Sequence, residues 1–500
     1  MKYNSTQSNK TIVDSAQAIA QGISVDGGLF VPQEFPKLTL DDLNKLLDMS
    51  YLDIAKYIFS LYLTDYTEDE INESVNKAYS EIKFESNNPT PVSTIISNSN
   101  ELNILELWHG PTSAFKDMAL QILPHLLSKA MKKTNAGKDA VILVATSGDT
   151  GKAALEGFKN VEGVKIIVFY PENGVSAIQK HQMRCQDGDN VFVCGINGNF
   201  DDAQTSVKKI FTDSKIREIL EQNGMMFSSA NSINFGRLLP QVVYYISGYL
   251  DLVNKEKVKL GDKINVVVPT GNFGNILAGF YAYMMGLPVN KFICASNSNN
   301  VLTDFINTGV YNKNRDFYTT ISPSMDILVS SNLERLIYFL SSSNDEYTKD
   351  LMQKLKTEGK YEVSDDIKEE ISKLFYGGFC DDQKTKSTIK DIYDNNHYLI
   401  DTHTSVAVSV YNEYVQNTND KTPVLIDSTA SPYKFSKSVL EAFHIESIPN
   451  DEFEIVDKLF EITNAPVPKP ILSIRDKEDR FNDSVEINDM EKVVLKQLGI

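Results

Sequence analysis

Residues 264–280 read INVVVPTGNFGNILAGF. The run 264–269 is almost entirely apolar and rich in β-branched residues, which is typical of a strand buried on both faces of a parallel sheet. A Gly-rich turn follows at 270–275, and an apolar stretch of helical character begins directly after it. Strand, tight turn and helix in direct succession predict an α/β unit, with the turn at the carboxyl end of the strand.

Five other runs have the same apolar, β-branched character. Helical patterns with one apolar face, such as DDAQTSVKKIF at 201–211, lie between them. The alternation predicts an α/β fold with parallel sheets. The five runs are DAVILVA (139–145), VKIIVFY (164–170), NVFVCGI (190–196), KFICAS (291–296) and PVLIDS (423–428).

A chain of 500 residues is too long for a single core. Residues 1–95 predict a small helical N-terminal domain. Within them, residues 39–63 keep helical spacing, and Thr39 with Asp42 has the pattern of a capping box. The stretch SNNPTPVSTI at 86–95 has two prolines among small polar residues and is the predicted boundary.

The remainder of the chain divides into two predicted α/β domains. The first catalytic domain is expected at 96–240 and the second at 241–500. Residues 300–395 interrupt the alternation, since they are charged and mostly helical in pattern. We therefore expect a helical insertion there, and we assign it no chemistry.

The charge balance excludes some partners. Lysine and arginine total 49 against 67 acids, a formal net charge of -18. Such a surface repels nucleic acid and anionic membranes, and no apolar run has the length of a membrane span. The four cysteines form no CxxC pair, and the first residues of the sequence are polar, unlike a secretory segment. Both observations favour a reducing cytoplasm. Six scattered histidines lack zinc-like spacing, so no metal site is expected.

The Gly-rich turn is the strongest candidate for a phosphate cradle. Gly271 and Gly274 allow the backbone to approach a ligand closely, and the following helix presents its positive end. The alternative is a plain strand-to-helix turn. A helix start is also predicted at TSGDTGKA (146–153), but this is not a nucleotide P-loop, because Thr146 and Ala153 stand where glycine and a hydroxyl residue are required. Lys152 is then predicted to be a helix-surface lysine.

Two more segments carry candidate chemistry. NSINFGR at 231–237 sets Arg237 among small polar residues, which suits a bidentate contact to an anion, although a surface arginine is the alternative. In HGPTSAFKD, Lys116 is either an ordinary residue of a first helical turn or a nucleophile held on a turn. A lysine, a phosphate cradle and a polar partner for a ring nitrogen are what pyridoxal phosphate needs.

Seven stretches occur in order along the chain and together resemble the threonine synthase family, in its longer form with a helical N-terminal domain. The resemblance covers nearly the whole chain. It implies the fold type II arrangement, in which two α/β domains hold the cofactor between them. The stretches are DGGLFVP (26–32), HGPTSAFKDMALQ (109–121), TSGDTG (146–151), NSINFGR (231–237), PTGNFGN (269–275), DTHTSVAV (401–408) and STASPYKF (428–435).

The resemblance implies roles for individual residues. Lys116 would bind pyridoxal 5'-phosphate covalently and act as the catalytic base. Asp149 would face the ring hydroxyl of the cofactor, and Thr429 would meet its ring nitrogen, with Ser428 as the rival. The cofactor phosphate would be held, or its pocket lined, by Gly271, Asn272, Phe273, Gly274 and Asn275. The substrate would be bound by Thr146, Ser147 and Thr150, and its phosphate by Asn231, Ser232 and Arg237.

Two positions depart from the family pattern. Ser431 stands where the family usually has histidine, and Thr402 where it often has proline. The departures concern the surroundings of the ring nitrogen and the last loop. They do not affect the lysine or the phosphate cradle.

The implied activity is the conversion of O-phospho-L-homoserine and water to L-threonine and phosphate, by a monomer or homodimer. One alternative is another fold type II enzyme, such as a threonine or serine dehydratase, which would need no second phosphate site. A second alternative is a non-catalytic relative that binds phosphorylated ligands, which we would expect to lack the lysine.

Overall fold

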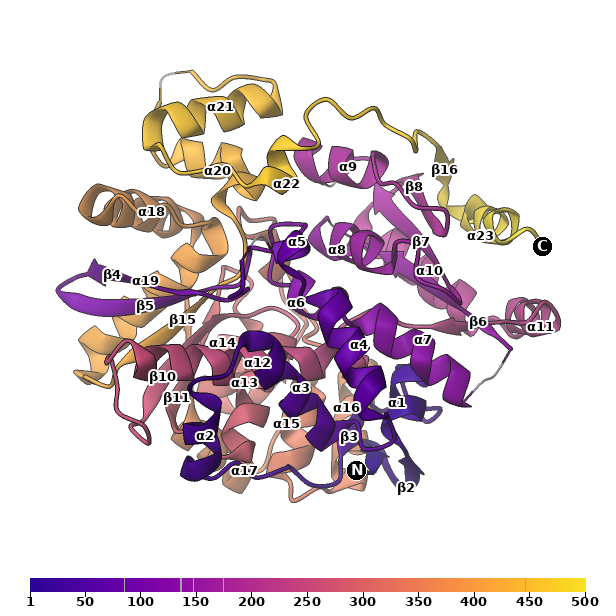
Figure 1. Cartoon of the computed structure of the whole chain (residues 1–500), viewed down its shortest axis with the longest axis horizontal. Helices are drawn as coiled ribbons and strands as arrows, with labels where there is room; N and C mark the ends of the chain where they lie inside the picture. The colour runs from indigo at the N-terminus through magenta and orange to yellow at the C-terminus, as the bar shows by residue number, and fades with distance from the viewer. Residues whose placement is uncertain (85, 135–136, 147, 174, 446) are drawn as a thin grey trace.

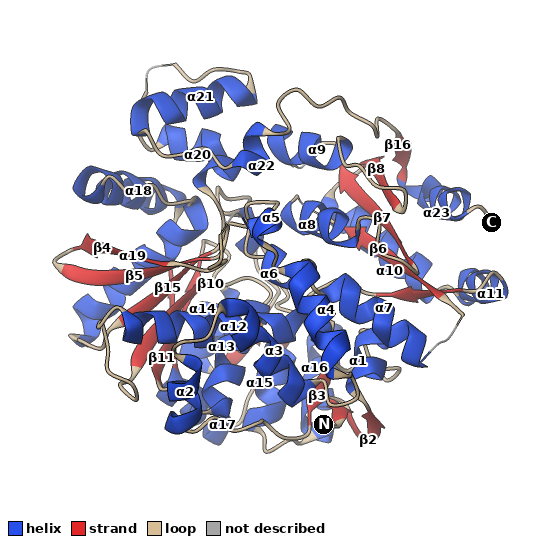
Figure 2. Cartoon of the chain, viewed as in Figure 1, coloured by secondary structure: helices blue, strands red, loops and turns tan. Residues whose placement is uncertain are grey.

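The structure is a computed structural model in which two sheets, mostly parallel, are surrounded by helices (Figures 1 and 2). None of the helices within the described part of the chain is long and apolar enough to span a membrane. The described residues are 1–84, 86–134, 137–146, 148–173, 175–445 and 447–500.

The larger sheet has six strands, and all neighbours are parallel except the antiparallel pair β4–β5. The two strands at its centre, β10 and β15, are buried at every position, as their apolar runs predict. In spatial order the strands are β14 (Phe375–Phe379), β11 (Val289–Ser296), β10 (Ile264–Pro269), β15 (Val424–Ser428), β5 (Asn100–Glu106) and β4 (Val92–Ser97).

The smaller sheet has five strands, all parallel to their neighbours. All six predicted strands are present in the two sheets. Strands β4, β5, β9, β14 and β16 were not predicted, because they are short or contain polar and glycine residues. In spatial order the smaller sheet contains β16 (Ser484–Glu486), β8 (Val191–Asn197), β7 (Val164–Pro171), β6 (Asp139–Ala145) and β9 (Met225–Ser228).

The sheets do not follow the predicted division of the chain at 95 and 240. Strand β5, from the expected first catalytic domain, pairs with β15 of the expected second one. The C-terminal β16 pairs with β8 of the smaller sheet, and β14 of the expected insertion pairs with β11. Hydrophobic patterning predicts that a strand exists but not which strand it pairs with, so the domain boundaries stay a prediction.

The N-terminal region is helical but also contains a sheet that was not predicted. This antiparallel sheet consists of β2 (Ser8–Val13), β1 (Tyr3–Ser5) and β3 (Phe30–Pro32). The predicted helix at 39–63 is two helices, because Ser50 starts a new one by accepting the N–H of Asp53. The capping box at Thr39 is confirmed. The helices are α1 (Ser15–Gln21), α2 (Leu40–Leu46), α3 (Tyr51–Tyr62), α4 (Glu68–Ala78) and α5 (Glu81–Phe84).

Helices cover both sheets. Helices α8 and α10 pack against the smaller sheet, α13 and α19 against the larger one, and the long, buried α12 packs on α13 (Figure 1). Up to residue 285 they are α6 (Asp117–Leu120), α7 (Leu123–Thr134), α8 (Asp149–Phe158), α9 (Ala177–Arg184), α10 (Phe200–Thr212), α11 (Ser214–Gln222), α12 (Phe235–Asn254) and α13 (Gly274–Met285).

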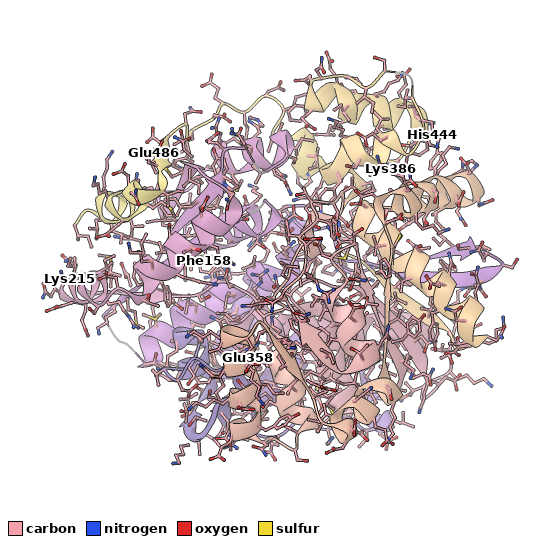
Figure 3. All side chains as sticks on the ribbon, turned by 180° about the vertical axis from the view of Figure 1, so that it is seen from behind. Phe158, Lys215, Glu358, Lys386, His444 and Glu486 are labelled. Carbon is pink, nitrogen blue, oxygen red and sulfur yellow. The ribbon has the colours of Figure 1, made fainter. Side chains whose placement is uncertain are left out.

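The expected insertion is mostly helical, and it also contains a small antiparallel pair, β12 (Val310–Asn312) and β13 (Lys360–Glu362). Its charged α18 is tied to the C-terminal helices by the ion pair of Lys386 with Glu441 at 2.6 Å, and Figure 3 shows Lys386 beside them. The remaining elements are α14 (Val301–Thr308), η1 (Pro323–Met325), α15 (Leu333–Leu340), α16 (Asp345–Thr357), α17 (Asp365–Leu374), α18 (Asp382–Asn396), α19 (Thr402–Thr418), η2 (Pro432–Phe435), α20 (Ser436–Glu441), α21 (Glu452–Thr463), α22 (Lys469–Leu472), η3 (Ile487–Asp489) and α23 (Met490–Leu498).

A glycine sets how closely α8 approaches α6, the short helix that starts at Lys116. A Cβ at Gly157 would lie 1.8 Å from the carbonyl oxygen of Leu120. The neighbouring atom is backbone, so the two helices would have to move apart to admit a methyl group. The position of α6, and with it that of Lys116, therefore depends on this contact.

We predict that Gly157→Ala lowers the free energy of unfolding by about 1–3 kcal/mol, the usual cost of overpacking. The matched control is Gly248→Ala in α12, where the added Cβ would meet only side-chain atoms of Leu105 and Leu425, at 3.1 Å. Alanine also favours a helix interior over glycine, so the control should be nearly neutral. Urea unfolding of both variants measures the difference, and equal effects would contradict the proposed helix contact.

Candidate active site

The loops that follow β5 and β15 leave the larger sheet side by side. Ser428 is opposite Glu106 in the parallel register. Beyond the sheet the two chains remain hydrogen-bonded, since the N–H of Phe115 donates to the carbonyl of Thr429 at 2.8 Å. The backbone therefore fixes Lys116 next to Thr429, at the carboxyl edge where ligands bind in parallel sheets.

A buried carboxyl group shapes the turn before Lys116. Asp117 accepts hydrogen bonds from the backbone N–H and the hydroxyl of Thr112, both at 2.8 Å. A Cβ at Gly110 would lie 2.6 Å from the Asp117 side chain, so only glycine fits there. Burial raises the pKa of Asp117 to about 6. The Gly-Pro turn thus folds around this carboxyl group and delivers Lys116 to the start of α6.

The amine of Lys116 is largely removed from water. Its Nζ lies 3.5 Å from Asp149 Oδ2 and 3.3 Å from Ser324 Oγ. Burial lowers the pKa of Lys116, the charge of Asp149 opposes that shift, and the cations Arg237 and Lys434 add to it. A lysine with a lowered pKa is the form of lysine suited to nucleophilic and base chemistry.

Asp149 is shared between two lysines. Its Oδ1 pairs with Lys434 at 2.8 Å and accepts from Gln179 Nε2 at 2.9 Å, whereas Lys116 lies farther away. These contacts hold the pKa of Asp149 well below its usual range. Sequence reasoning assigned no role to Lys434 or Gln179, although Lys434 lies in the quoted stretch STASPYKF.

The Gly-rich loop, Gly271–Asn275, ends at an uncapped helix start. Phe273 is the N-cap of α13 with φ +62°, and its side chain makes no capping hydrogen bond. A left-handed conformation at a bulky residue is costly and is typical of functional loops. The first turn of α13 thus has no side-chain cap, and an anion is one group that its N–H donors could bind.

The side chain of Asn275 points into the core instead of toward a ligand. Its Oδ1 accepts from the hydroxyls of Tyr244 and Tyr245, and its Nδ2 donates to Asp427 Oδ2 at 2.9 Å. Burial raises the pKa of Asp427 to about 7. Asn275 could therefore contact a phosphate through its backbone N–H but not through its side chain.

A segment of the expected insertion lies over the Gly-rich loop. We call residues 322–335 the cover segment. Ser330 Oγ donates to the carbonyl of Gly271 at 2.8 Å, and the N–H of Asn332 donates to the carbonyl of Asn272 at 3.1 Å. Part of the stretch 300–395, to which the sequence analysis assigned no chemistry, thus lies against the Gly-rich loop. The serines and the asparagine at the two ends of SPSMDILVSSN (322–332) were the available signal.

Arg237 is a buried cation without a carboxylate partner among the described residues. Its Nη1 donates to the carbonyl of Ala230 at 2.9 Å, and burial alone lowers its pKa to about 10. Asn231 is exposed and Ser232 is half-buried. The hydroxyl of Ser232 lies 3.4 Å from that of Ser331, so the segment around Arg237 touches the cover segment.

The other predicted substrate-binding residues lie at the start of α8. Thr146 Oγ1 accepts the N–H groups of Gly148 and Gly151, at 3.0 and 2.9 Å. The hydroxyl of Thr146 thus holds the loop. Thr150 is half-buried in the first turn of the helix, and Ser147 lies outside the described residues.

Lys152 is not the surface lysine that the sequence predicted. Its side chain is buried, pairs with Glu156 at 3.1 Å and hydrogen-bonds Gln186. The side of α8 that carries Lys152 packs toward α9, and the sequence pattern alone did not reveal this contact. The partners explain how the charge is accommodated.

The two candidates for the ring nitrogen have different surroundings. Ser428 Oγ accepts from Trp108 Nε1 at 3.1 Å and from Thr404 Oγ1 at 3.0 Å. The hydroxyl of Thr429 makes no hydrogen bond to any residue that the structure describes. Of the departing positions, Ser431 caps η2 by accepting the N–H of Tyr433 at 3.3 Å, and Thr402 begins α19.

These residues fit pyridoxal 5'-phosphate. A buried lysine of lowered pKa suits its aldehyde, an uncapped helix start suits its phosphate, and the unengaged hydroxyl of Thr429 suits its ring nitrogen. No group of three or more histidine, cysteine, aspartate or glutamate side chains in the described ranges could hold a metal ion.

Three family models match consecutive parts of the chain. "Threonine synthase N terminus" matches residues 2–79, "Pyridoxal-phosphate dependent enzyme" matches 84–364, and "Threonine synthase, C-terminal" matches 404–494. The second model identifies the cofactor as pyridoxal 5'-phosphate, in agreement with the fit of the site.

Individual proteins similar to this chain carry the same family name as two of these models. Human "Threonine synthase-like 1" is 40% identical over 444 residues, which are 87% of this chain and 58% of that protein. The chain thus spans less than two thirds of the length of that relative. The threonine synthase of Saccharomyces cerevisiae is 37% identical over 478 residues, 90% of each chain.

Solved structures show the same fold. The crystal structure of threonine synthase from yeast superimposes with a TM-score of 0.89 at 33% identity, covering 100% of this chain and 99% of that one. The pyridoxal-phosphate-bound threonine synthase from Brucella melitensis gives 0.87 at 32% identity, covering 99% of both chains. The chain therefore belongs to the threonine synthase family of fold type II pyridoxal-phosphate enzymes.

Proposed function

We propose that this chain is a threonine synthase, a lyase that converts O-phospho-L-homoserine and water to L-threonine and phosphate. The observation that carries the proposal is Arg237, a buried cation beside Lys116 without a carboxylate partner among the described residues. A substrate phosphate would supply the missing negative charge. A dehydratase acting on free threonine or serine has no use for such a group.

The substrate phosphate would bind where Arg237 and Ser232 approach the cover segment. Arg237 offers a fork of N–H donors, and Ser232 and Asn231 add short polar side chains at the mouth of the site. Phosphate leaves as an anion, so the same donors would stabilise the charge that develops on the leaving oxygen. One group of residues then serves both recognition and catalysis.

Lys116 would perform the proton transfers. Bound pyridoxal 5'-phosphate supplies an electron sink next to the α-carbon of the substrate. The free amine of Lys116 lies in a dry site with a lowered pKa, which favours its neutral, proton-accepting form. It would take the proton from Cα and return protons to the carbon chain. The ion pair of Asp149 with Lys434 would keep Asp149 in place beside the amine.

Different residues would contact the phosphate, the ring nitrogen and the ring hydroxyl of the cofactor. The Gly-rich loop would hold the phosphate through backbone N–H groups, since the Asn275 side chain is already engaged. Thr429 would meet the ring nitrogen, because its hydroxyl has no other partner among the described residues. Ser428 stays the rival, since its oxygen accepts from Trp108 and Thr404 and its own O–H can still donate. Asp149 would stand near the ring hydroxyl, and Thr146, Ser147 and Thr150 near the substrate.

We also propose the compartment, the oligomeric state and the domain boundaries. We expect a cytoplasmic protein that is a monomer or a homodimer. We expect each chain to divide into domains at about residues 95 and 240. The four cysteines are buried and free, which is in keeping with a reducing compartment. The direct test of function is release of inorganic phosphate from O-phospho-L-homoserine with equimolar threonine. Turnover of threonine or serine instead would favour the dehydratase, and binding without turnover the non-catalytic relative.

We predict that borohydride reduction of the holoenzyme fixes the cofactor on Lys116, as located by peptide mapping. Lys116→Ala should still bind pyridoxal 5'-phosphate weakly, because the contacts of the Gly-rich loop remain. The buried lysines Lys152 and Lys434 are internal controls. A label on either of them, or on no lysine, would remove the basis of the assignment.

We predict that Arg237→Ala costs about 2–5 kcal/mol of transition-state binding, which is typical of losing a desolvated charge partner. This corresponds to a decrease of roughly 30-fold to several thousand-fold in kcat/KM for O-phospho-L-homoserine. Lysine should restore little, because it lacks the bidentate fork. The control is Arg315→Ala, which removes a surface ion pair with Asp304. Unchanged kinetics in Arg237→Ala would mean that another residue holds the phosphate.

We predict that Thr429→Asp binds the cofactor but releases less threonine per turnover and accumulates the pyridoxamine form. A carboxylate would keep the ring nitrogen protonated and strengthen electron withdrawal at Cα, at the expense of chemistry at Cβ and Cγ. Ser428→Ala is the matched control. If Thr429→Asp and Thr429→Ala both retain the native product ratio, Thr429 is not the partner of the ring nitrogen.

A further inference from the structure

Two side-chain oxygens among the described residues accept from the amine of Lys116, and the hydroxyl of Ser324 is the nearer of them. Ser324 Oγ lies 3.3 Å from Lys116 Nζ, and Asp149 Oδ2 lies 3.5 Å away. Asp149 is also engaged by Lys434 and Gln179, so its charge is divided. Ser324 belongs to η1, in the part of the chain for which the sequence predicted no chemistry.

The backbone of Ser324 is held on two sides. Its N–H donates to Nε2 of His403 at 3.1 Å. Its carbonyl oxygen packs on the Gly-rich loop, where a Cβ at Gly271 would lie only 2.5 Å from it. Ser324 thus lies between Lys116, the Gly-rich loop and His403. His403 belongs to the stretch DTHTSVAV, to which the sequence analysis assigned no role.

The ring of His403 is fixed in one tautomer. Because Nε2 accepts the N–H of Ser324, the ring proton is on Nδ1, which lies 3.0 Å from Asp401 Oδ1. His403 and Asp401 are both buried, and Asp401 also caps α19 by accepting the N–H of His403 at 2.8 Å. A rigid chain of contacts therefore extends from the start of α19 to the amine.

We propose that Ser324 is a further residue of the active site, which holds the free amine of Lys116 through its hydroxyl, and that His403, oriented by Asp401, is its positioning residue. The charged groups that face the amine are Asp149, Arg237 and Lys434. Among them only Asp149 favours the protonated amine, and Ser324 adds a second acceptor for it. Loss of that acceptor shifts the amine toward its neutral form.

The inference rests on the proposed role of Lys116, and the test separates the two. Full-length, cofactor-free chain is mixed with pyridoxal 5'-phosphate across a range of pH, and the rate of covalent attachment is followed by absorbance. The midpoint of this rate profile reports the ionisation of the attacking amine. Ser324→Ala should lower the midpoint by about one to two pH units, the scale of one hydrogen bond to a charged group.

Conservative variants distinguish this role from a general structural one. Ser324→Thr keeps the hydroxyl and should keep the midpoint, whereas Ser324→Cys, with a weak acceptor, should behave like alanine and serves if the alanine variant does not fold. His403→Leu should shift the midpoint in the same direction, and His403→Gln, which retains an acceptor, should shift it less. Asp401 is not substituted, because it also caps α19.

Ser330→Ala is the matched control, since Ser330 lies in the same segment and contacts the Gly-rich loop but not the lysine. It should slow attachment equally at every pH without moving the midpoint. An unmoved midpoint in both Ser324→Ala and Ser324→Cys overturns the proposal, and an unmoved midpoint in His403→Leu overturns the positioning role. Borohydride mapping that places the cofactor on another lysine overturns the proposed function itself, independently of the midpoints.

Discussion

The amine of Lys116 is buried, and its one carboxylate partner among the described residues, Asp149 at 3.5 Å, is shared with Lys434; the chemistry of the site depends on that arrangement. Asp149 is closer to Lys434 than to Lys116, and Arg237 nearby has no acid within the described residues. Three basic side chains thus gather around one acid, inside a chain whose formal net charge is -18. A local excess of positive charge in an acidic protein attracts anions, such as the phosphate of the cofactor.

A second buried cation organises the walls of the site. Arg335 is fully buried and donates to the carbonyl of Phe30 at 3.0 Å and to that of Ile233 at 2.6 Å, while also binding Asn332. One guanidinium thereby joins the N-terminal strand β3, the segment that leads to Arg237, and the cover segment. Its planar fork of donors reaches two backbone carbonyls that are far apart in the sequence, and also the side-chain oxygen of Asn332 in its own segment.

Much of this arrangement could be predicted from the sequence, and the limits have physical reasons. The six buried strands of strongest apolar character were predicted, because burial on both faces selects continuous β-branched runs. The loops at their carboxyl ends were predicted for the same reason. Strand partners were not, because periodicity reveals a buried face but not the strand beside it. Thus the pairing of β5 with β15 and of β16 with β8 became known only from the structure.

For the site, the residues on loops after strong strands were accessible to sequence reasoning, and those that act through tertiary contact were not. Lys434 was visible in a quoted stretch, but nothing in the sequence places it against Asp149. Ser324 and Ser330 come from a segment without strand or helix periodicity, whose position over the Gly-rich loop is a product of folding. The buried state of Lys152 was missed for the same reason.

The pairing of β5 with β15 has a consequence for how the chain is assembled. Asn103 and Val424 are hydrogen-bonded although they are 321 positions apart. While the chain is synthesised, β5 emerges early and has only β4 as a partner in the larger sheet until β15 follows. The centre of that sheet, and the edge that carries Lys116 and Thr429, can close only after most of the chain has left the ribosome. Contacts of such long range make folding slow, so we expect the candidate active site to be among the last parts of the molecule to form.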